Sequence, residues 1–533
     1  MPALTNLFDL NAVVGYSSAA QPDFPHVSDL LAHMDRLGIA RALTWHVAAR
    51  DFHGRFGNER LLDEIASTPG ASGRIFPSFV LTPTMLYESG ALEWLHGAMT
   101  DHRVRALRFS LVRGEWSLDE IYPLLDQLLG LAPVLLLDLR DGLPKPSLLG
   151  LAERYPSMPI VLTQGMWPDM VRAFDLLRRH DNFLLETSWL HSHGTLDLLA
   201  RTFGAERVVF GTGPRSHQGA AIAGLSQSSL SGSARDAVAH GNAERLLGLP
   251  PLASPLPKSP LQRNPLWSRL LRREPLGVDC IDAHAHNGPM GMWLWEEADP
   301  ARQAQIMLDW MDRLGISLTL VSGEQALFCE PLEGNRALED VLAPHGERFR
   351  GYLGFNAFYA RELEPLFDDF FSRPFFVGFK VLADYHGVPV TDSRYVPVWQ
   401  YAHAHRLPIL VHTWGGAYDA PSLLADIAPA YPEAIFLLGH SGGSVRSEAE
   451  DLAVANPNVY LEFCGSFTVP DSWERTIARV GADRVVFGSD AIAHDIYWEL
   501  GRLLSQDVPE DQLAAILGAN MRGILARRSH NSA

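Results

Sequence analysis

Short apolar runs and amphipathic stretches alternate along the second half of the chain. Most of the runs are separated by segments in which apolar residues recur with the helical period, such as QAQIMLDWMDRLG at 303–315. The eight runs, which we interpret as strands, are CIDAHAH, SLTLVSG, RGYLGFN, FFVGFKV, PILVHTW, AIFLLGH, NVYLEF and RVVFGSD. Eight strands alternating with helices over about 250 residues predict a (β/α)8 barrel. An open doubly wound sheet is the alternative, but no glycine-rich phosphate loop follows the first run.

The same pattern occurs twice along the chain. MDRLGI is found at 34–39 and again at 311–316, and GAERVVFGTG at 204–213 matches GADRVVFGSD at 481–490. Because the offsets all lie near a single value of about 275 residues, we predict a tandem duplication of one barrel. The α/β fold class is therefore two tandem (β/α)8 TIM barrels. The expected division is a first domain at 1–249, a linker at 250–276 that includes the Pro- and Ser-rich PPLASPLPKSPLQRNP, and a second domain at 277–533.

Composition narrows the class of protein. Of the 533 residues, 47% are hydrophobic and 20% charged, which is an ordinary globular balance. The net charge of −18 argues against nucleic-acid and membrane partners, because both need clustered Lys and Arg. Three cysteines are too few for a disulfide framework, and MPALTNLFDL has no basic segment followed by an apolar one. We therefore expect a cytoplasmic protein that acts on a small molecule.

Candidate chemistry lies at predicted strand ends of the second copy. His284 and His286 are two residues apart at the end of the first run, so both side chains face the same side of the strand. His412, His440 and Asp490 end the fifth, sixth and eighth runs. Active sites of these barrels form where the carboxyl ends of the strands meet. Four imidazoles and a carboxylate at that rim suit one divalent ion, with zinc favoured over manganese, iron or cobalt.

The first copy serves as an internal control. It has Asn11, Val13, Leu137, Gln164 and Gly213 where the second has His284, His286, His412, His440 and Asp490. A barrel without these five residues is expected to fold, so their role in the second copy is chemical rather than structural. Asp282 and Glu462 are shared with the first copy as Asp9 and Glu186, and we interpret these pairs as structural. The first copy is thus expected to be degenerate, a pseudoenzyme domain without metal ligands.

The motifs DAHAHNG, GFK (378–380), DSRYVPVWQYAHAHRLPILVHTWGG (392–416), GHSGG (439–443) and RVVFGSD together resemble the amidohydrolase-related proteins, metal-dependent hydrolases and decarboxylases. The resemblance implies that His284, His286 and His412 bind the metal. It implies that Asp490 binds the metal or acts as a base, and that His440 contacts substrate or stabilises developing negative charge. Lys380 lies where binuclear relatives carry a carboxylated lysine that bridges two metals, and an ordinary lysine paired with a rim carboxylate is the alternative.

The sequence of the loops that would bind substrate predicts their contacts less directly than the strand ends predict the metal ligands. Relatives often have His-Pro two positions after the lysine, whereas this chain has Leu382-Ala383. Tyr385 and His386 are candidates to replace those contacts. Trp414, which follows His412, is a candidate aromatic wall of the pocket.

Three functions follow from these residues. The leading hypothesis is metal-assisted hydrolysis of an amide, lactone or ester of a small carboxylated molecule, because a zinc-type ion makes water acidic enough to attack at neutral pH. The alternatives are a decarboxylase acting on an unsaturated or aromatic acid, and a non-catalytic two-barrel scaffold. We expect the two barrels to form an intramolecular pseudo-dimer through an interface well above ~1,000 Å², with further oligomerisation left open. Expression of 277–533 alone tests whether the first half stabilises the second.

Overall fold

The chain divides into two compact units, Met1–Asn264 and Pro265–Ala533. The computed structural model describes residues 4–110, 116–217, 219–252, 259–291, 293–294, 296–465 and 473–528. The boundary between the units lies inside the predicted linker, of which 253–258 is outside the described residues. No helix in these described ranges has the length and apolar character needed to cross a bilayer.

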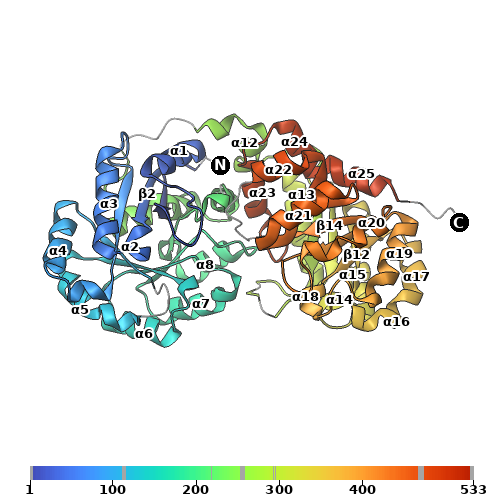
Figure 1. The fold of residues 1–533 in the computed structure, drawn as a ribbon, viewed down its shortest axis with the longest axis horizontal. Coiled ribbons are helices and arrows are strands. Elements are labelled where there is room, and N and C mark those ends of the chain that lie inside the picture. The colour runs from blue at the N-terminus through green and yellow to red at the C-terminus, as the bar shows by residue number, and fades with distance from the viewer. Residues whose placement is uncertain are drawn as a thin grey trace. The chain divides into compact units, whose positions relative to one another are not determined.

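The first unit is built on eight parallel strands that pair in chain order (Figure 1). The strands are β1 (Leu7–Val14), β2 (Ile39–His46), β3 (Ile75–Val80), β4 (Ala106–Phe109), β5 (Val134–Asp138), β6 (Ile160–Thr163), β7 (Phe183–Glu186) and β8 (Val208–Val209). The helices between and after them are α1 (Val27–Leu37), α2 (Ala48–Asp51), α3 (Gly54–Ser67), α4 (Ala91–Asp101), α5 (Tyr122–Leu128), α6 (Lys145–Arg154), α7 (Met170–Arg179), α8 (Thr195–Phe203), α9 (Ala220–Gln227), α10 (Gly232–Asp236) and α11 (Asn242–Leu247).

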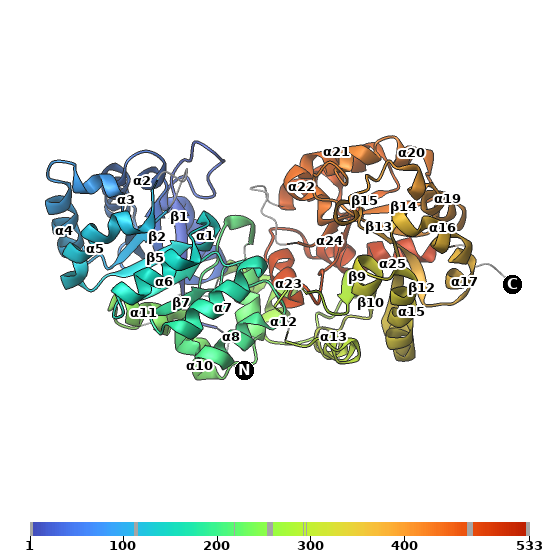
Figure 2. The same ribbon diagram turned by 90° about the horizontal axis from the view of Figure 1, so that it is seen from below.

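The second unit repeats this arrangement (Figure 2). Its strands are β9 (Ile281–Asn287), β10 (Leu318–Gly323), β11 (Phe349–Phe355), β12 (Phe376–Val381), β13 (Pro408–His412), β14 (Ile435–Gly439), β15 (Val459–Phe463) and β16 (Val485–Phe487). Its helices are α12 (Pro265–Leu271), α13 (Pro300–Leu314), α14 (Glu324–Phe328), α15 (Pro331–Leu342), α16 (Ala360–Leu363), α17 (Phe367–Ser372), α18 (Ala383–His386), α19 (Val396–His405), α20 (Ile427–Ala430), α21 (Arg446–Ala455), α22 (Trp473–Val480), α23 (Ile496–Leu504), α24 (Glu510–Ala514) and α25 (Asn520–Ala526).

Backbone hydrogen bonds join the last strand of each sheet to the first. In the first unit Leu10 N donates to Phe210 O over 2.9 Å, and in the second Asp490 N donates to His284 O over 2.7 Å. The buried Asp9 and Asp282 strengthen the same seams, because each accepts from the backbone N–H of Thr212 and Ser489 respectively. Each unit is therefore a (β/α)8 barrel, and the predicted fold class is confirmed.

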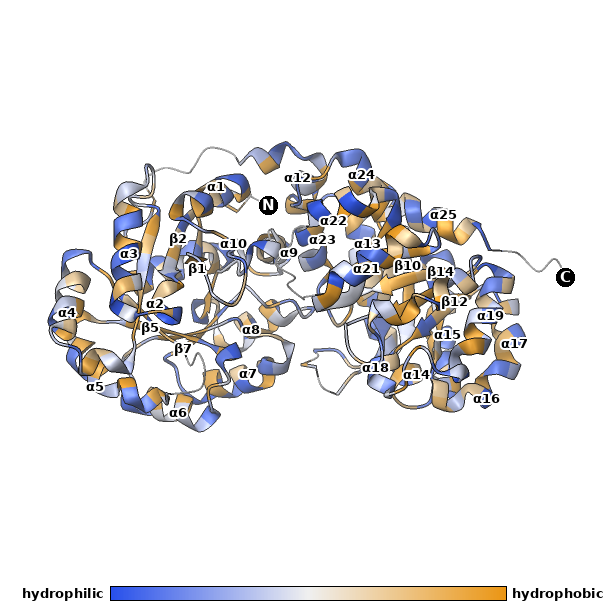
Figure 3. Cartoon of the chain, viewed as in Figure 1, coloured by the Kyte–Doolittle hydropathy of each residue, from blue (hydrophilic) through white to orange (hydrophobic). Residues whose placement is uncertain are grey.

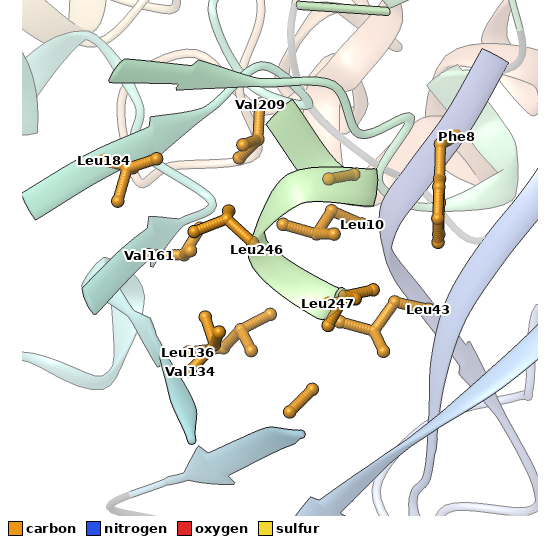
Figure 4. Packing of buried hydrophobic residues seen from close by; sticks show 12 residues of the cluster. Phe8, Leu10, Leu43, Val134, Leu136, Val161, Leu184, Val209, Leu246 and Leu247 are labelled. Carbon is orange, nitrogen blue, oxygen red and sulfur yellow. The ribbon is translucent and has the colours of Figure 1, made fainter. Parts of the chain in front are cut away.

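Alternate residues of the strands fill each barrel with apolar side chains. In the first unit Leu10, Leu43, Leu136 and Val161 meet inside the barrel, where α11 adds Leu246 and Leu247 from one end (Figure 4). The second unit has an equivalent cluster that contains Ala283, Leu320, Tyr352 and Leu410. Figure 3 shows the apolar character of the strands against helices that carry hydrophilic residues. These layers make each barrel a packed core, which leaves the carboxyl ends of the strands as the place for a site.

The repeated motif MDRLG ends a helix in both units. Gly38 follows α1 with φ 80°, and Gly315 follows α13 with φ 77°. This left-handed conformation strains residues that have a Cβ, so glycine is favoured at this position. The duplication thus preserves residues that fix the entry into β2 and β10.

Candidate metal centre and its surroundings

Four predicted site residues meet at the mouth of the second barrel. His284 and His286 point inward from β9, Lys380 from β12, and Asp490 follows β16. His284 Nε2 lies 3.1 Å from His286 Nε2 and 2.7 Å from Lys380 Nζ. Asp490 Oδ1 is 3.1 Å from His286 Nε2 and 3.4 Å from His284 Nε2. The structure therefore brings together three residues that could ligate one ion, with a lysine beside them.

Carboxylates behind the two histidines set the orientation of their rings. His284 Nδ1 lies 3.1 Å from Glu462 Oε2, and His286 Nδ1 lies 3.0 Å from Glu324 Oε1. His284 Nδ1 is thus placed to donate to Glu462, and a carboxylate oxygen of Glu324 lies beside His286 Nδ1, while the Nε2 atoms of both rings face the shared space. This pairing of carboxylate and histidine is the usual way in which proteins orient an imidazole toward a metal.

The donor set fits a divalent cation. With both Nδ1 atoms facing carboxylates, the lone pairs on His284 Nε2, His286 Nε2 and Asp490 Oδ1 point into one small space. Bonds of ~2.0–2.2 Å from a central zinc ion to nitrogen and oxygen place such ligands about 3 Å apart. The observed separations match that spacing, and positive charge at the centre would relieve the repulsion between the lone pairs.

Burial controls the charges of the cluster. It lowers the pKa of Lys380, which is fully buried. It also holds the pKa of His284 well below its usual value, an effect that Lys380 reinforces. For Asp490 burial acts in the opposite direction, but His284 and a hydrogen bond from His286 outweigh it, so the pKa of Asp490 stays well below its usual value. Although burial lowers the pKa of His286, Glu324 and Asp490 raise it to about 9, so a metal ion that binds His286 Nε2 must displace a proton from this ring. Without the ion the centre holds the neutral imidazole of His284, the protonated imidazole of His286 and the ionised carboxylate of Asp490 at neutral pH.

His412, which the resemblance predicts as a third histidine ligand, lies in a cluster beside these three donors, and its role as a ligand stays a prediction. Its Nδ1 lies 2.9 Å from Asp419 Oδ2, and its ring stacks on Trp414 with centroids 5.3 Å apart. The ring of His440 lies against both, 4.8 Å from His412 and 4.9 Å from Trp414. In the described part of the chain, no group of close donor atoms includes His412. The sequence could not show this, because strand-end position fixes the rim and not the depth of a side chain.

Cys464 is a member of the site that the sequence analysis missed. Its Sγ donates to Glu462 Oε2 over 2.9 Å and lies 3.2 Å from His440 Nδ1. It lies 3.4 Å from His284 Nδ1, so it forms a second group of close donors with His284 and His440. Ser188 makes the equivalent contact with Glu186 over 2.7 Å in the first barrel, and a comparison of the two copies at this position would have identified the cysteine.

The predicted substrate-binding residues divide into two places. The ring of Tyr385, which is 50% exposed, lies edge-on to His412 at 5.4 Å. His386 instead hydrogen-bonds through Nε2 to the carbonyl of Leu327 in α14 at 2.7 Å. Tyr385 and Trp414 thus form an aromatic surround at the mouth, whereas the contact of His386 is structural.

The first barrel keeps the backbone of this site with other side chains. Gln164 has φ 55° where His440 has φ 61°, and Gly213 has φ 70° where Asp490 has φ 57°. Glu186 Oε2 accepts from Asn11 Nδ2 at 3.3 Å, as Glu462 faces His284. Glu462 therefore has two roles. It accepts a hydrogen bond from the backbone N–H of His440 over 3.0 Å, and it orients the ring of His284, a candidate metal ligand.

One correspondence predicted from the sequence is wrong. In the ladders Arg108 pairs with Leu136 and Lys380 with Leu410, so Asp138 rather than Leu137 occupies the place of His412. The short apolar runs PVLLL and PILVH both begin with proline, and alignment of the two prolines produces the error of one position. The first barrel thus carries a carboxylate at this position.

Solved structures with a similar fold include dihydroxybenzoic acid decarboxylase from Polaromonas sp. JS666 with bound manganese, at 17% identity over 48% of this chain and 99% of that one, with a TM-score of 0.38. They also include 5-carboxyvanillate decarboxylase from Sphingomonas paucimobilis, at 15% identity over 48% of this chain and 100% of that one, with a TM-score of 0.36. Likeness at this level concerns the fold alone. No curated protein matches the chain.

The family comparison covers both barrels. The family described as Amidohydrolase matches residues 22–249 and again residues 281–525, which together make up most of the chain. The match includes the strands that carry Lys380, His412, His440 and Asp490. The chain belongs to the amidohydrolase family.

Proposed function

We propose that the second barrel holds one divalent metal ion and decarboxylates a small, planar, unsaturated or aromatic acid. The observation that carries the proposal is the convergence of His284 Nε2, His286 Nε2 and Asp490 Oδ1 on one space, with each imidazole oriented by a carboxylate. When bound, the metal supplies positive charge that polarises a substrate oxygen. Zinc and manganese are both compatible with this nitrogen and oxygen set.

The surroundings of the metal centre favour decarboxylation over attack by water. His284 and Lys380 are fully buried, and His286 and His440 are each 7% exposed. The rings of Trp414 and Tyr385 stand beside His412. An aromatic rim suits a flat conjugated body, and the buried centre destabilises a carboxylate relative to carbon dioxide, because little water reaches its charge.

The chain's own residues then divide the work. Asp419 holds the proton on His412 Nδ1, which leaves the lone pair of Nε2 on that ring to contact the substrate. Burial lowers the pKa of His440 well below its usual value, so its imidazole is neutral and serves to position the substrate. Lys380 lies against the ligand His284, where its amine supports the developing negative charge.

Hydrolysis of an amide, lactone or ester is the second candidate. The observation in its favour is Asp490, whose carboxylate is ionised and stands beside two imidazoles. Such a carboxylate is suited to accept a proton from an attacking water. The two candidates therefore share the metal centre and differ in the bond that breaks.

Product analysis separates the two reactions. Metal-loaded protein is incubated with one panel of hydroxylated aromatic and unsaturated acids and a second panel of lactones, esters and amides. We expect carbon dioxide release from a member of the first panel. A new carboxylate or amine without carbon dioxide would establish hydrolysis instead, and turnover of neither panel would leave the barrel as a binding module.

Asp490→Asn tests the assignment of the centre. We expect turnover to fall by ~10²–10⁴-fold, as is typical when a positioned catalytic acid or base is lost. The melting temperature should change little, since Gly213 occupies the same place in the first barrel. The control Asp483→Asn changes an exposed carboxylate of the same unit and should keep full turnover. An Asp490→Asn protein with near-normal turnover would contradict the assignment.

A further inference from the structure

A buried guanidinium occupies the mouth of the first barrel where the second barrel has Lys380. Arg108 lies on β4, is 3% exposed, and pairs in the ladder with Leu136, as Lys380 pairs with Leu410. Its Nη2 donates to Asn11 Oδ1 over 2.7 Å, and Asn11 stands at the position of His284. The side chain therefore lies at the level at which Lys380 stands in the second barrel.

Two buried donors at this mouth have no acceptor among the described residues. These are Nε of Arg108 and Nε1 of Trp189, whose side chain is 2% exposed and follows β7. A buried donor without an acceptor costs about 1–3 kcal/mol, and more when the donor is charged. Both unsatisfied groups donate, so a ligand that satisfies them must bring acceptor oxygens.

Aromatic rings and guanidinium groups alternate around Arg108. Its Cζ lies 5.3 Å from the ring centroid of Trp45, and Arg50 Cζ lies 5.2 Å from the same ring. Arg140 Cζ lies 5.0 Å from the ring of Trp189. Indole faces accept flat unsaturated bodies, and a guanidinium binds a carboxylate through two parallel hydrogen bonds.

The carboxylates near Arg108 have hydrogen-bond partners of their own and only partly offset its positive charge. Asp138 is bound by the Gln164 amide, and Glu186 accepts from Ser188 Oγ and Asn11 Nδ2. Burial raises the pKa of Asp138 to about 6 and that of Glu186 to about 7. Asp141 also faces Arg108, and Arg50, which acts on Arg108 with its positive charge, is itself paired with Asp51 over 2.7 Å. The donors that lack an acceptor, rather than an excess of positive charge, therefore favour a ligand with acceptor oxygens.

We propose that the mouth of the first barrel is a separate binding site, without chemistry of its own, for a small planar carboxylate held by Arg108. The site does not depend on the function proposed for the second barrel. Occupancy would place acceptor oxygens on the guanidinium and the body of the ligand against Trp45. The first barrel would then be a ligand-binding domain rather than an inert copy.

The test uses the full chain, from which the metal is first removed with a chelator. Benzoate is the probe, and isothermal titration calorimetry measures its binding. We expect saturable binding of benzoate and at least tenfold weaker binding of benzyl alcohol, which has the same ring and no carboxylate. Arg108→Gln should weaken benzoate binding by at least tenfold. Arg178→Gln, which alters an exposed arginine of the same barrel, is the control and should leave benzoate binding unchanged.

If Arg108→Gln fails to fold, Arg108→Lys serves as a second variant, because it keeps the positive charge of the side chain. It loses the two-pronged geometry, and benzoate affinity should again fall while the melting temperature stays close to that of the wild type. The proposal is overturned if the metal-free wild type does not bind benzoate. It is also overturned if Lys380→Gln removes binding while Arg108→Gln retains it, because the probe would then occupy the second barrel.

Discussion

At the scale of single residues, the ion pair of His286 and Glu324 distinguishes the two barrels as sharply as the ligands do. The first barrel has Val13 and Val47 at these positions, and both pack in one small apolar cluster with Trp45. A charged pair in one copy and an apolar pair in the other indicate that Glu324 serves His286 and not the fold. A position-by-position comparison of the two copies would have revealed Glu324.

Glu324→Gln should weaken metal binding without unfolding the barrel. The amide keeps the shape of the side chain but removes the charge that fixes the Nδ1 proton of His286, and loss of such partners typically costs ~10–100-fold in metal affinity. Titration with zinc and manganese measures the effect. Glu330→Gln, which changes a carboxylate that accepts from the exposed Gln325 side chain, is the matched control. Unaltered affinity in Glu324→Gln would remove this residue from the site.

Glu186 should make the first barrel less stable as pH rises. Burial raises its pKa from 4.5 to about 7. The folded protein therefore holds its proton more tightly than the unfolded chain does, so this contribution to stability is complete below pH 4.5 and is lost as pH rises through about 7. Glu186→Gln removes the titration. Relative to the wild type, the variant should gain up to about 3 kcal/mol between pH 4.5 and pH 8.

Denaturant unfolding of both proteins across this pH range measures the gain. A constant difference between variant and wild type would show that Glu186 does not titrate with folding. Because the comparison is a difference, pH effects common to the two proteins cancel.

At the scale of elements, apolar runs were a sufficient guide to the strands. PILVHTW contains β13 (Pro408–His412), and AIFLLGH contains β14 (Ile435–Gly439), with similar agreement along the barrel. The run RVVFGSD contains only β16 (Val485–Phe487), and beyond this strand Ser489 N is shared between Asp282 Oδ1 and His284 O. Contacts through side chains such as Asp419 and Glu324 could not be predicted, because they depend on how loops fold back over the rim.

The helix pair α14 and α15 supports Glu324 through one glycine. A Cβ at Gly334 would collide with the backbone nitrogen of Ala326, and Gly57 is packed against Ala49 in the same way in the first barrel. Gly334→Ala should therefore push α14 away, which we expect to cost about 1–3 kcal/mol of unfolding free energy. Since α14 begins at Glu324, metal affinity should fall as well.

Chemical denaturation and metal titration measure these two effects. Gly523→Ala is the control, because a Cβ there meets nothing within 4 Å, and alanine within α25 should be neutral or stabilising by up to ~1 kcal/mol. If the two variants had the same unfolding free energy and the same metal affinity, the contact between α14 and α15 would be shown to accommodate a Cβ at residue 334.

At the scale of the whole molecule, each unit has a closed barrel and a core of its own. The predicted interface between the barrels stays a prediction. The two mouths share a backbone and differ in side chains, so we expect about one metal ion per chain. Combining Asn11→His, Val13→His, Val47→Glu and Gly213→Asp should raise the content toward two ions, although the Cβ of residue 213 would meet Ser188 Cβ at 2.9 Å and require it to shift.

Elemental analysis of the purified wild type and of this four-residue variant measures the content. Val47→Gln in place of Val47→Glu is a matched control, because it supplies a polar side chain without the charge that orients the imidazole. Two ions in the wild type would contradict a single centre, and one ion in a folded variant would show that the first mouth needs more than these ligands.

Both barrels lie on one chain, and this has a consequence for dosage. Two separate subunits would be made in variable amounts and would part on dilution, whereas translation of one message delivers the two mouths in a ratio of one to one. That ratio holds at any concentration of the protein. The two barrels are also inherited together. Because one gene encodes both, neither barrel can be combined with a partner barrel from another lineage.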